Sequence, residues 1–241
     1  ICHCLVGSEM CIRDRIKPDL RQRIRVDGSL KPAAPRLKSK QRVPSQITAL
    51  IEGRKILTIV SSHFEDEQFA IRSVKKIPKE MRPILLIIPR HIERTETIRD
   101  QCTKADLKCT ILSELSEVSS ISDVYVSNQI GAPAVWLPLT NFALIGVTYC
   151  NVNGHNPWEP IQFGAAILHG SKTANFAEDF KELLASESST EILETDDMAK
   201  LITQTNFDQQ IKNASSLLQK KMGAVKDLSN DILLLVSSKP I

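Results

Sequence analysis

The sequence of 241 residues has few of the features that single out a class of protein. Only 5% of the residues are aromatic, and the net charge is +3, with basic and acidic side chains interleaved along the chain. This weak excess of positive charge disfavours nucleic acid as a partner, because nucleic-acid-binding surfaces are usually strongly basic. A content of 42% hydrophobic and 24% charged residues is typical of an ordinary soluble globular protein.

Long apolar runs and cysteine motifs are also missing. The longest apolar runs, near residues 84–89 and 232–236, are far shorter than the roughly 18 residues that a membrane-spanning helix needs. Any membrane contact is therefore expected to be peripheral. The cysteines form neither a CxxC pair nor a metal-binding spacing, and we interpret Cys102, Cys109 and Cys150 as reduced thiols. The sequence predicts neither a metal nor another cofactor.

The chain divides into four segments. Residues 1–15 resemble a translated sequencing adapter, above all at SEMCIRDR, so we exclude them from fold reasoning and expect the natural reading frame to continue upstream. Residues 16–48 are basic and rich in proline, which disfavours a long helix or a central strand, and they are predicted to be an interdomain linker and remnant. Residues 49–205 are predicted to form one domain, and residues 206–241 a C-terminal helix.

Short apolar runs alternate with helix-like segments through the predicted domain. The runs KILTIVS, PILLIIP, CTIL, DVYVS, NFALIGV and AAILHG begin at residues 55, 83, 109, 123, 141 and 165. Strands without polar residues are those covered on both faces, and their alternation with helices predicts a Rossmann-like, doubly wound parallel sheet of the α/β class. In the last segment, apolar residues at three- and four-residue spacing predict an amphipathic helix; these are Phe207, Ile211, Ala214, Leu218 and Met222.

Polar residues cluster where the predicted strands end. Such sheets bind ligands beyond the carboxyl ends of their strands, where loops lead into helices. Four of these turns carry polar clusters: SSHFEDE at 61–67, PRHIER at 89–94, NVNGHNPWEP at 151–160 and GSKTANFAED at 170–179. No serine–histidine–aspartate order, pair of catalytic carboxylates or P-loop can be read in the sequence. The turns therefore predict a nucleotide or phospho-ligand site of undecided chemistry.

The GHNPWEP turn at 154–160 has two compatible interpretations. As a helix start, Asn156 suits the N-cap, Pro157 the first helical position and Glu159 the third position of a capping box. The glycine, histidine and tryptophan are left unexplained by this interpretation, and a helix start with free N–H groups also binds anions. In a ligand site, Glu159 would accept both hydroxyls of a ribose while the neighbouring amides face a phosphate.

The other turns have structural alternatives as well. Arg90 suits a phosphate or carboxylate ligand, but it is equally explained as a solvated helix-start residue paired with Glu93. Arg94 is expected at the surface. Asn175 is either a local cap or a ligand contact.

In the first turn, Ser62 and Glu65 form an S-x-x-E pattern that is typical of a capping box. His63 stands alone there and does not predict a metal site. The capping interpretation is therefore favoured over a ligand role for this turn.

The order of these turns resembles one protein family. From VDGSLKP at 26–32 to about residue 205, the chain is similar to the C-terminal, donor-binding domain of the Kdo (3-deoxy-D-manno-octulosonic acid) transferases. GHNPWEP is similar to the family's Gly-Gly-His-Asn-Pro-Leu-Glu-Pro, IPRHIER to Pro-Arg-His-Pro-Glu-Arg and SSHFEDE to Ser-Thr-His-x-Gly-Glu-Glu. GSKTANFAED is similar to Gly-Pro-His-x-x-Asn-Phe-x-Glu, and DGSLK to Thr-Gly-Asn-Leu-Lys. Five matches in the same order make the resemblance specific.

The resemblance implies the C-terminal half of a GT-B glycosyltransferase. The family transfers Kdo from CMP-Kdo to a lipid A precursor in lipopolysaccharide biosynthesis, on the cytoplasmic face of the inner membrane, and needs no metal at the chemical centre. We expect this chain to carry the donor-binding half only. The general base, the acceptor surface and any membrane anchor are expected in an N-terminal domain outside the chain, so the fragment alone is predicted to be inactive.

The resemblance also implies roles for individual residues. Lys31 falls where the family has a lysine that helps to stabilise the transition state. The residues implied to contact CMP are Pro89, Arg90, Ile130, Gly131, Ala132, Asn156, Pro157, Trp158 and Glu159, and further candidates are Ser62, His63, His155 and Asn175.

The chain departs from the family pattern at two turns, where Ala132 replaces a glutamate and Asn153 replaces the first of two glycines. These departures favour one alternative function, that of a non-catalytic homologue which kept the nucleotide cleft. A second alternative is a GT-B enzyme that uses another nucleotide sugar.

Overall fold

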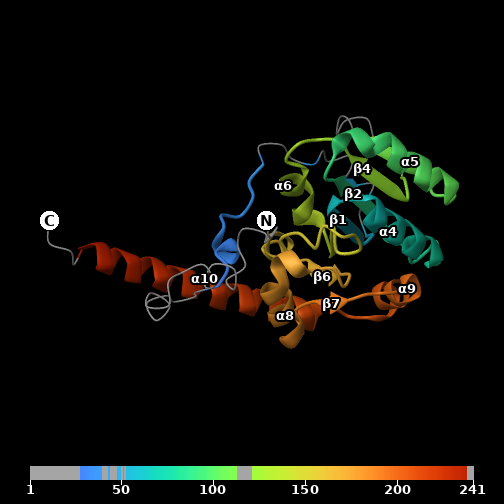
Figure 1. Cartoon of the computed structure of the whole chain (residues 1–241). Coiled ribbons are helices and arrows are strands. Elements are labelled where there is room, and N and C mark those ends of the chain that lie inside the picture. The colour runs from blue at the N-terminus through green and yellow to red at the C-terminus, as the bar shows by residue number, and fades with distance from the viewer. Residues whose placement is uncertain are drawn as a thin grey trace.

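The computed structural model describes residues 28–39, 43, 48–49, 51, 53–112 and 121–237. The prediction for residues 1–15 lies outside these ranges. The described residues form a seven-stranded sheet with the order β3-β4-β2-β1-β5-β6-β7, and helices cover both of its faces (Figure 1). The strands are β1 (Ile56–Ser62), β2 (Ile84–Pro89), β3 (Cys109–Leu112), β4 (Val124–Ser127), β5 (Phe142–Ile145), β6 (Ala166–His169) and β7 (Thr190–Glu191).

All strand pairings are parallel, which confirms the predicted sheet. Each of the six apolar runs forms a strand whose ends lie within two residues of the predicted ones, whereas the two-residue strand β7 was not predicted. Strands β2, β4, β5 and β6 are buried along their whole length. Burial on both faces explains why their sequences carry uninterrupted apolar residues.

The helices form two layers around the sheet. One face packs against α4 (Phe64–Lys76), α5 (Thr95–Lys104) and α9 (Thr195–Gln204). The other face packs against α6 (Ala132–Trp136), α7 (Trp158–Ile161), α8 (Ala177–Ala185) and α10 (Asp208–Ser237). Four short 3₁₀ turns complete the described elements: η1 (Lys31–Ala33), η2 (Ile92–Arg94), η3 (Leu137–Leu139) and η4 (Ala174–Phe176).

The helix α10 is packed only in its first half. Ala214 and Leu218 are buried against the sheet, while Met222 is 38% exposed and Leu234 is 68% exposed. Figure 1 shows the second half of the helix extending away from the sheet. Most of the predicted apolar stripe is therefore confirmed, but its last member, Met222, lies where the packed face gives way to solvent. No helix of the described residues has the length and apolar character to span a bilayer.

The buried carboxylate of Asp66 joins two loops of the sheet. Asp66 lies in the first turn of α4, and its Oδ2 accepts hydrogen bonds from the N–H groups of His63 at 2.9 Å and Val147 at 2.7 Å. Its Oδ1 accepts a third bond from the N–H of Tyr149 at 3.3 Å. Burial raises the pKa of Asp66, and the three main-chain bonds oppose that shift. One carboxylate thus fixes the loop after β1 to the loop after β5.

We predict that Leu218→Ala lowers the free energy of unfolding by about 2–4 kcal/mol, because it removes a buried side chain and leaves a cavity. Leu234→Ala is the matched control on the same helix, since Leu234 is 68% exposed, and its effect should stay within about 0.5 kcal/mol. Urea unfolding followed by circular dichroism measures both. Equal losses for the two variants would contradict the half-packed arrangement of α10.

We also predict that Asp66→Asn destabilises the protein. The amide of asparagine has only one acceptor oxygen, so main-chain donors lose their partner, at about 1–3 kcal/mol for each buried donor left unsatisfied. Asp106→Asn is the control, because Asp106 is exposed and pairs with Lys75 at the surface, and it should change stability little. The thermal unfolding temperatures of both variants measure this difference in stability. A stable Asp66→Asn protein would show that the two loops are held by other contacts.

Candidate functional site

The polar turns predicted from the sequence lie at one edge of the sheet. Strands β4, β2, β1, β5 and β6 are consecutive neighbours and run parallel, so the loops that follow them leave from the same edge. This edge, formed by residues 61–64, 90–94, 128–132, 146–157 and 170–175, is called the carboxyl edge below. It carries all the predicted site residues except Lys31, Pro89, which ends β2, and the α7 residues Trp158 and Glu159, which follow directly from the loop after β5.

The turn around Asn156 is ordered by its own side chains. The Oδ1 of Asn156 accepts the N–H of Trp158 at 3.1 Å, and its Nδ2 donates to Oε1 of Glu159 at 3.2 Å. The predicted placement of Pro157 inside the helix is wrong by one position, because α7 begins at Trp158 and Pro157 precedes it as the N-cap. The prediction of Asn156 as the N-cap is wrong by the same step: Asn156 precedes the N-cap, although its side chain accepts the N–H of the first helical residue, and Glu159 binds the asparagine side chain rather than the main chain.

Trp158 belongs to the core of the domain. Its side chain is fully buried, in the same cluster as Ile161 and Phe180. Burial raises the pKa of Asp179, and the indole of Trp158 lies close enough to oppose that shift. The tryptophan that a helix start alone did not explain is therefore explained by packing, and its side chain is unavailable to a ligand.

The residues before Asn156 are held in an uncommon conformation. Asn153 and Gly154 both have positive φ angles, of 68° and 88°. A Cβ atom at Gly154 would lie 3.2 Å from the carbonyl oxygen of Lys172, so the close approach of the two loops favours glycine there. Asn175 fixes this arrangement, because its Nδ2 donates to the carbonyl of Val152 at 2.6 Å and its N–H to that of Asn153 at 2.9 Å. Its amide therefore supports the turn.

Three loops bring imidazole and guanidinium groups together. The main-chain N–H of Arg90 donates to the carbonyl of Ser62 at 3.1 Å, which sets the loop after β2 beside the loop after β1. The rings of His63 and His91 meet edge to face, with centroids 5.7 Å apart. Burial lowers the pKa of His155, and the charges of Arg90 and His63 lower it further. Arg90 and His63 thus lie within electrostatic reach of His155.

The exposed guanidinium of Arg90 makes no hydrogen bond or ion pair with the described residues, and it is not paired with Glu93 as one prediction held. Glu93 lies instead beside His91, at 3.5 Å. Arg94 lies only partly at the surface as predicted, because 29% of its side chain is exposed and its guanidinium pairs at 2.6 Å with Glu67, whose side chain is fully buried. Arg94 holds the loop after β2 to α4.

The capping box predicted for Ser62 and Glu65 is also wrong. The side chain that bonds the start of α4 is that of Asp66, which accepts the N–H of His63, one position further along. Ser62 is buried, and its hydroxyl donates to Oε1 of Glu67 at 3.0 Å. Its hydroxyl is thus engaged inside the fold. The overlapping pattern from His63 to Asp66 was the signal in the sequence that would have identified this cap.

The remaining predicted residues border the site from two sides. Ile130 is 94% exposed in the loop after β4, and Gly131, with a φ of 80°, leads into α6, where Ala132 is buried. Pro89 is the buried last residue of β2. Lys31 is exposed on η1, which packs against α7 and α10.

Two contacts hold the segment that follows η1 in place. The Nε2 of Gln162 donates to the carbonyl of Ala34 at 2.8 Å. The guanidinium of Arg36 lies 4.2 Å from the centre of the Phe163 ring. This segment is thereby fixed beside the end of α7, the helix that carries Glu159.

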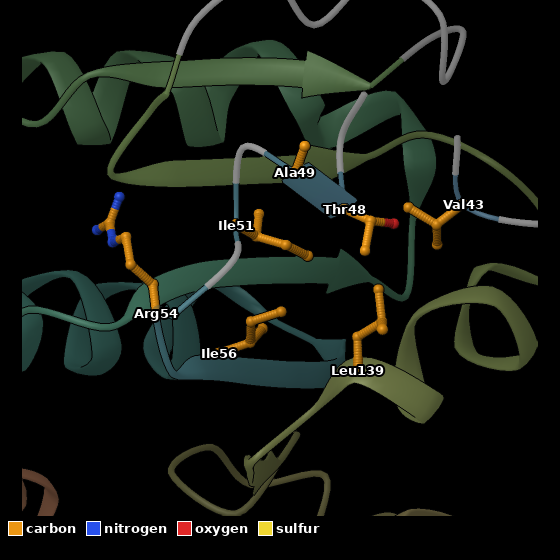
Figure 2. A pocket seen from close by; sticks show the side chains of 7 residues that line it. All are labelled: Val43, Thr48, Ala49, Ile51, Arg54, Ile56 and Leu139. Atoms are coloured by element: carbon orange, nitrogen blue, oxygen red, sulfur yellow. The ribbon is translucent and has the colours of Figure 1, made fainter. Parts of the chain in front are cut away.

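A separate cavity of about 630 Å³ lies away from these loops. Its lining residues are Val43, Thr48, Ala49, Ile51, Arg54, Ile56 and Leu139, which Figure 2 shows around the amino end of β1. None of the predicted site residues lines it. The described residues also contain no group of three or more His, Cys, Asp or Glu that could hold a metal ion.

The chemistry available at the carboxyl edge is that of an anion site. Arg90 supplies a fixed positive charge, and the imidazoles of His63 and His155 supply nitrogen atoms from neighbouring loops. The carboxylate of Glu159, beside Asn156, has its Oε1 engaged, and its Oε2 makes no hydrogen bond with the described residues and is left for a further donor. Such a set suits a phosphate together with a hydroxylated sugar.

No protein-family model matches the chain. Among curated proteins, it is 24% identical over 205 residues to the 3-deoxy-D-manno-octulosonic acid transferase of Rickettsia felis, a match that covers 85% of this chain and 43% of that protein. The enzyme of the same name from Haemophilus influenzae is 24% identical over 195 residues, which cover 78% of this chain and 46% of that protein. The chain thus spans less than half the length of these relatives.

The fold has matches among solved structures. The C-terminal CMP-Kdo binding domain of WaaA from Acinetobacter baumannii matches with a TM-score of 0.64 at 19% identity, over 73% of this chain and 97% of that one. HepE from Anabaena, solved in complex with UDP-glucose, matches with a TM-score of 0.55 at 12% identity, over 84% of this chain and 54% of that one. The fold is that of a GT-B C-terminal domain. The chain is thus similar in sequence to curated 3-deoxy-D-manno-octulosonic acid transferases and similar in fold to the C-terminal CMP-Kdo binding domain of WaaA.

Proposed function

We propose that the chain is the donor-binding half of a Kdo transferase and holds the CMP part of CMP-Kdo at its carboxyl edge. The observation that carries the proposal is the convergence of Arg90, His63 and His155 from three loops at the place where parallel sheets bind ligands. Cationic and N–H groups gathered from several loops suit the phosphate of a nucleotide. The relationship to Kdo transferases supports the choice of CMP-Kdo as the donor.

We assign different side chains of the site to different parts of the nucleotide. We assign the phosphate to Arg90, because its guanidinium is exposed and has no hydrogen-bonding partner among the described residues. We assign the ribose hydroxyls to Glu159, which Asn156 holds in position through the bond to Oε1. The loop after β4, with Ile130 and Gly131, borders the site and is assigned to the nucleotide as well.

Several of the residues that the resemblance implies as CMP contacts have buried side chains. Pro89, Ala132 and Trp158 have buried side chains, so any contact with CMP must come from their main chain. Pro157 closes the turn at the N-cap of α7. We therefore propose that these residues position the neighbouring groups.

The proposed chemistry depends on stabilising the departing CMP. As the bond from Kdo to the phosphate breaks, negative charge develops on the phosphate and positive charge on the sugar, and preorganised cations lower the barrier. Arg90 is one such cation. We propose Lys31 as another, since η1 sets it on the side of α7.

The whole enzyme would pass Kdo to a lipid A precursor. We propose that the acceptor and the general base belong to another domain, that the enzyme works as a peripheral protein at the cytoplasmic face of the inner membrane, and that this fragment alone is inactive. Two observations favour the two alternative functions. Ala132 lacks the carboxylate of the family pattern, which favours a non-catalytic nucleotide-binding homologue. The fold is also shared with HepE, solved with UDP-glucose, which favours a GT-B enzyme with another donor.

Calorimetric titration with CMP and with UMP tests the proposed donor. We expect the chain to bind CMP more tightly than UMP, and tighter binding of UMP would favour the enzyme with another donor. Arg90→Ala should weaken CMP binding about 10- to 100-fold, as expected for a lost hydrogen bond to a charged group. Arg99→Ala is the control with the same change of charge, because Arg99 is exposed on α5 and pairs with Glu96. Equal affinities of both variants would contradict the phosphate role of Arg90.

Glu159→Ala should weaken CMP binding by about 1–3 kcal/mol if the carboxylate holds the ribose. The affinity for 2′-deoxy-CMP should fall less, because that ligand lacks one of the hydroxyls. Since Glu159 also bonds to Asn156, the unfolding free energy of the variant is measured beside its affinity. Lower stability with unchanged CMP affinity would leave Glu159 with a capping role only.

A further inference from the structure

His155 carries a polar atom that the fold encloses without a partner. Its Nε2 is shut off from solvent and makes no hydrogen bond within the described residues. A buried polar atom without a hydrogen bond lowers the stability of the folded protein unless a ligand or an ordered water molecule supplies that bond. The backbone of the turn that carries it is fixed by Asn175 and by the close approach of Gly154 to Lys172, whereas the imidazole can still rotate about its side-chain bonds toward a ligand.

The surroundings of His155 favour the neutral form of the imidazole in the free protein. Burial lowers its pKa, and the charge of Arg90, from the loop after β2, and of His63, from the loop after β1, lowers it further. Further charged or titratable groups on adjoining elements are Glu159 on α7, Lys172 in the loop after β6, Glu65 and Asp66 at the start of α4, and His91, Glu93 and Arg94 in the loop after β2. A bound phosphate would reverse this balance, because two negative charges beside the ring favour its cationic form.

We infer that His155 contacts the phosphate of the nucleotide through Nε2, and that the imidazole gains a proton from solvent when a phosphate dianion binds. This inference rests on the proposed function and assigns a task to one residue of that site. The protonated ring donates from Nε2 to a phosphate oxygen and adds a second positive charge beside Arg90. No covalent bond is formed or broken, and the proton returns to solvent when the nucleotide leaves.

The sign of the pH dependence follows from these two states. His155 has a pKa below its ordinary value in the free protein, and the phosphate raises it in the complex. Between the two values, binding takes up a proton, so affinity falls as the pH rises through the pKa of the complex. The phosphate of CMP loses its own second proton near pH 6, and measurements from pH 7.0 to 8.5 avoid that titration.

The test is calorimetric titration of CMP into the whole chain at pH 7.0 and 8.5, in buffers of different ionisation enthalpy. We expect proton uptake at pH 7.0 and roughly three- to tenfold weaker binding at pH 8.5. His155→Gln should abolish both the uptake and the pH dependence. Arg99→Gln is the control, because Arg99 is exposed on α5, outside the carboxyl edge, and pairs with Glu96, and it should behave as the unchanged chain does. Cytidine, which lacks the phosphate, should bind without proton uptake in every variant.

A second measurement uses the unchanged protein, in case His155→Gln fails to fold. The imidazole carbon-bound proton of His155 is titrated by NMR with and without CMP, and its pKa should rise on binding. If the chain binds CMP with no such rise, or if His155→Gln keeps the pH dependence, the inference is overturned while the proposed function stands. If the unchanged chain binds no CMP, the proposed function fails and the inference with it.

Discussion

The first turn of α4 holds the site together through two adjacent buried acids. Asp66 reaches the loop after β5 through the N–H groups of Val147 and Tyr149, and Glu67 reaches the loop after β2 through Arg94. A buried carboxylate is costly unless its oxygen atoms are hydrogen-bonded or paired, and here each acid is satisfied by a different loop. Because α4 itself follows β1, three neighbouring loops are tied to one short segment, and the position of Arg90 depends on it.

The same edge of the sheet contains unusual backbone conformations. Ser61, Val147 and Asn153 have positive φ angles of 58°, 56° and 68°, a region that residues other than glycine seldom occupy. The conformation is least favourable for Val147, which is β-branched, yet its N–H makes the shorter of the two bonds to Oδ2 of Asp66. The hydrogen bond therefore offsets local strain. Asparagine tolerates this region better than other residues, so Asn153 preserves the turn although it replaces a glycine of the family pattern.

The parts of the fold that could be predicted from the sequence are those governed by local pattern. A strand covered on both faces must be apolar throughout, as β2 is, and parallel strands bring their following loops to one edge. The gathering of the polar turns followed from these two rules. Strand β7 was missed because two residues leave no periodicity to detect. The exact start of a helix was missed at α4 and α7, where overlapping cap patterns differ by one position.

Contacts between distant residues were beyond such reasoning. The choice of Asp66 as the capping residue depends on Val147, which lies 81 positions further along the chain. Arg94 was expected at the surface because no residue near it in the sequence indicates its partner, Glu67, which lies 27 positions away. The burial of Trp158 likewise depends on α8 and α10, which close the core around it. The sequence indicated which loops meet, whereas the structure decides which side chains in them remain free for a ligand.

The carboxyl edge is better suited to holding a leaving group than to activating an acceptor. Glycosyl transfer needs a base to take the proton of the acceptor hydroxyl. At this edge the oxygen atoms of Asp66 and Glu67 already accept bonds from the fold, and Glu159 is bonded to Asn156. Arg90 is a strong donor there, because its guanidinium makes no hydrogen bond or ion pair with the described residues. An arrangement rich in donors stabilises the charge that develops on a departing phosphate, and it fits the proposed division in which a second domain brings the acceptor and its base.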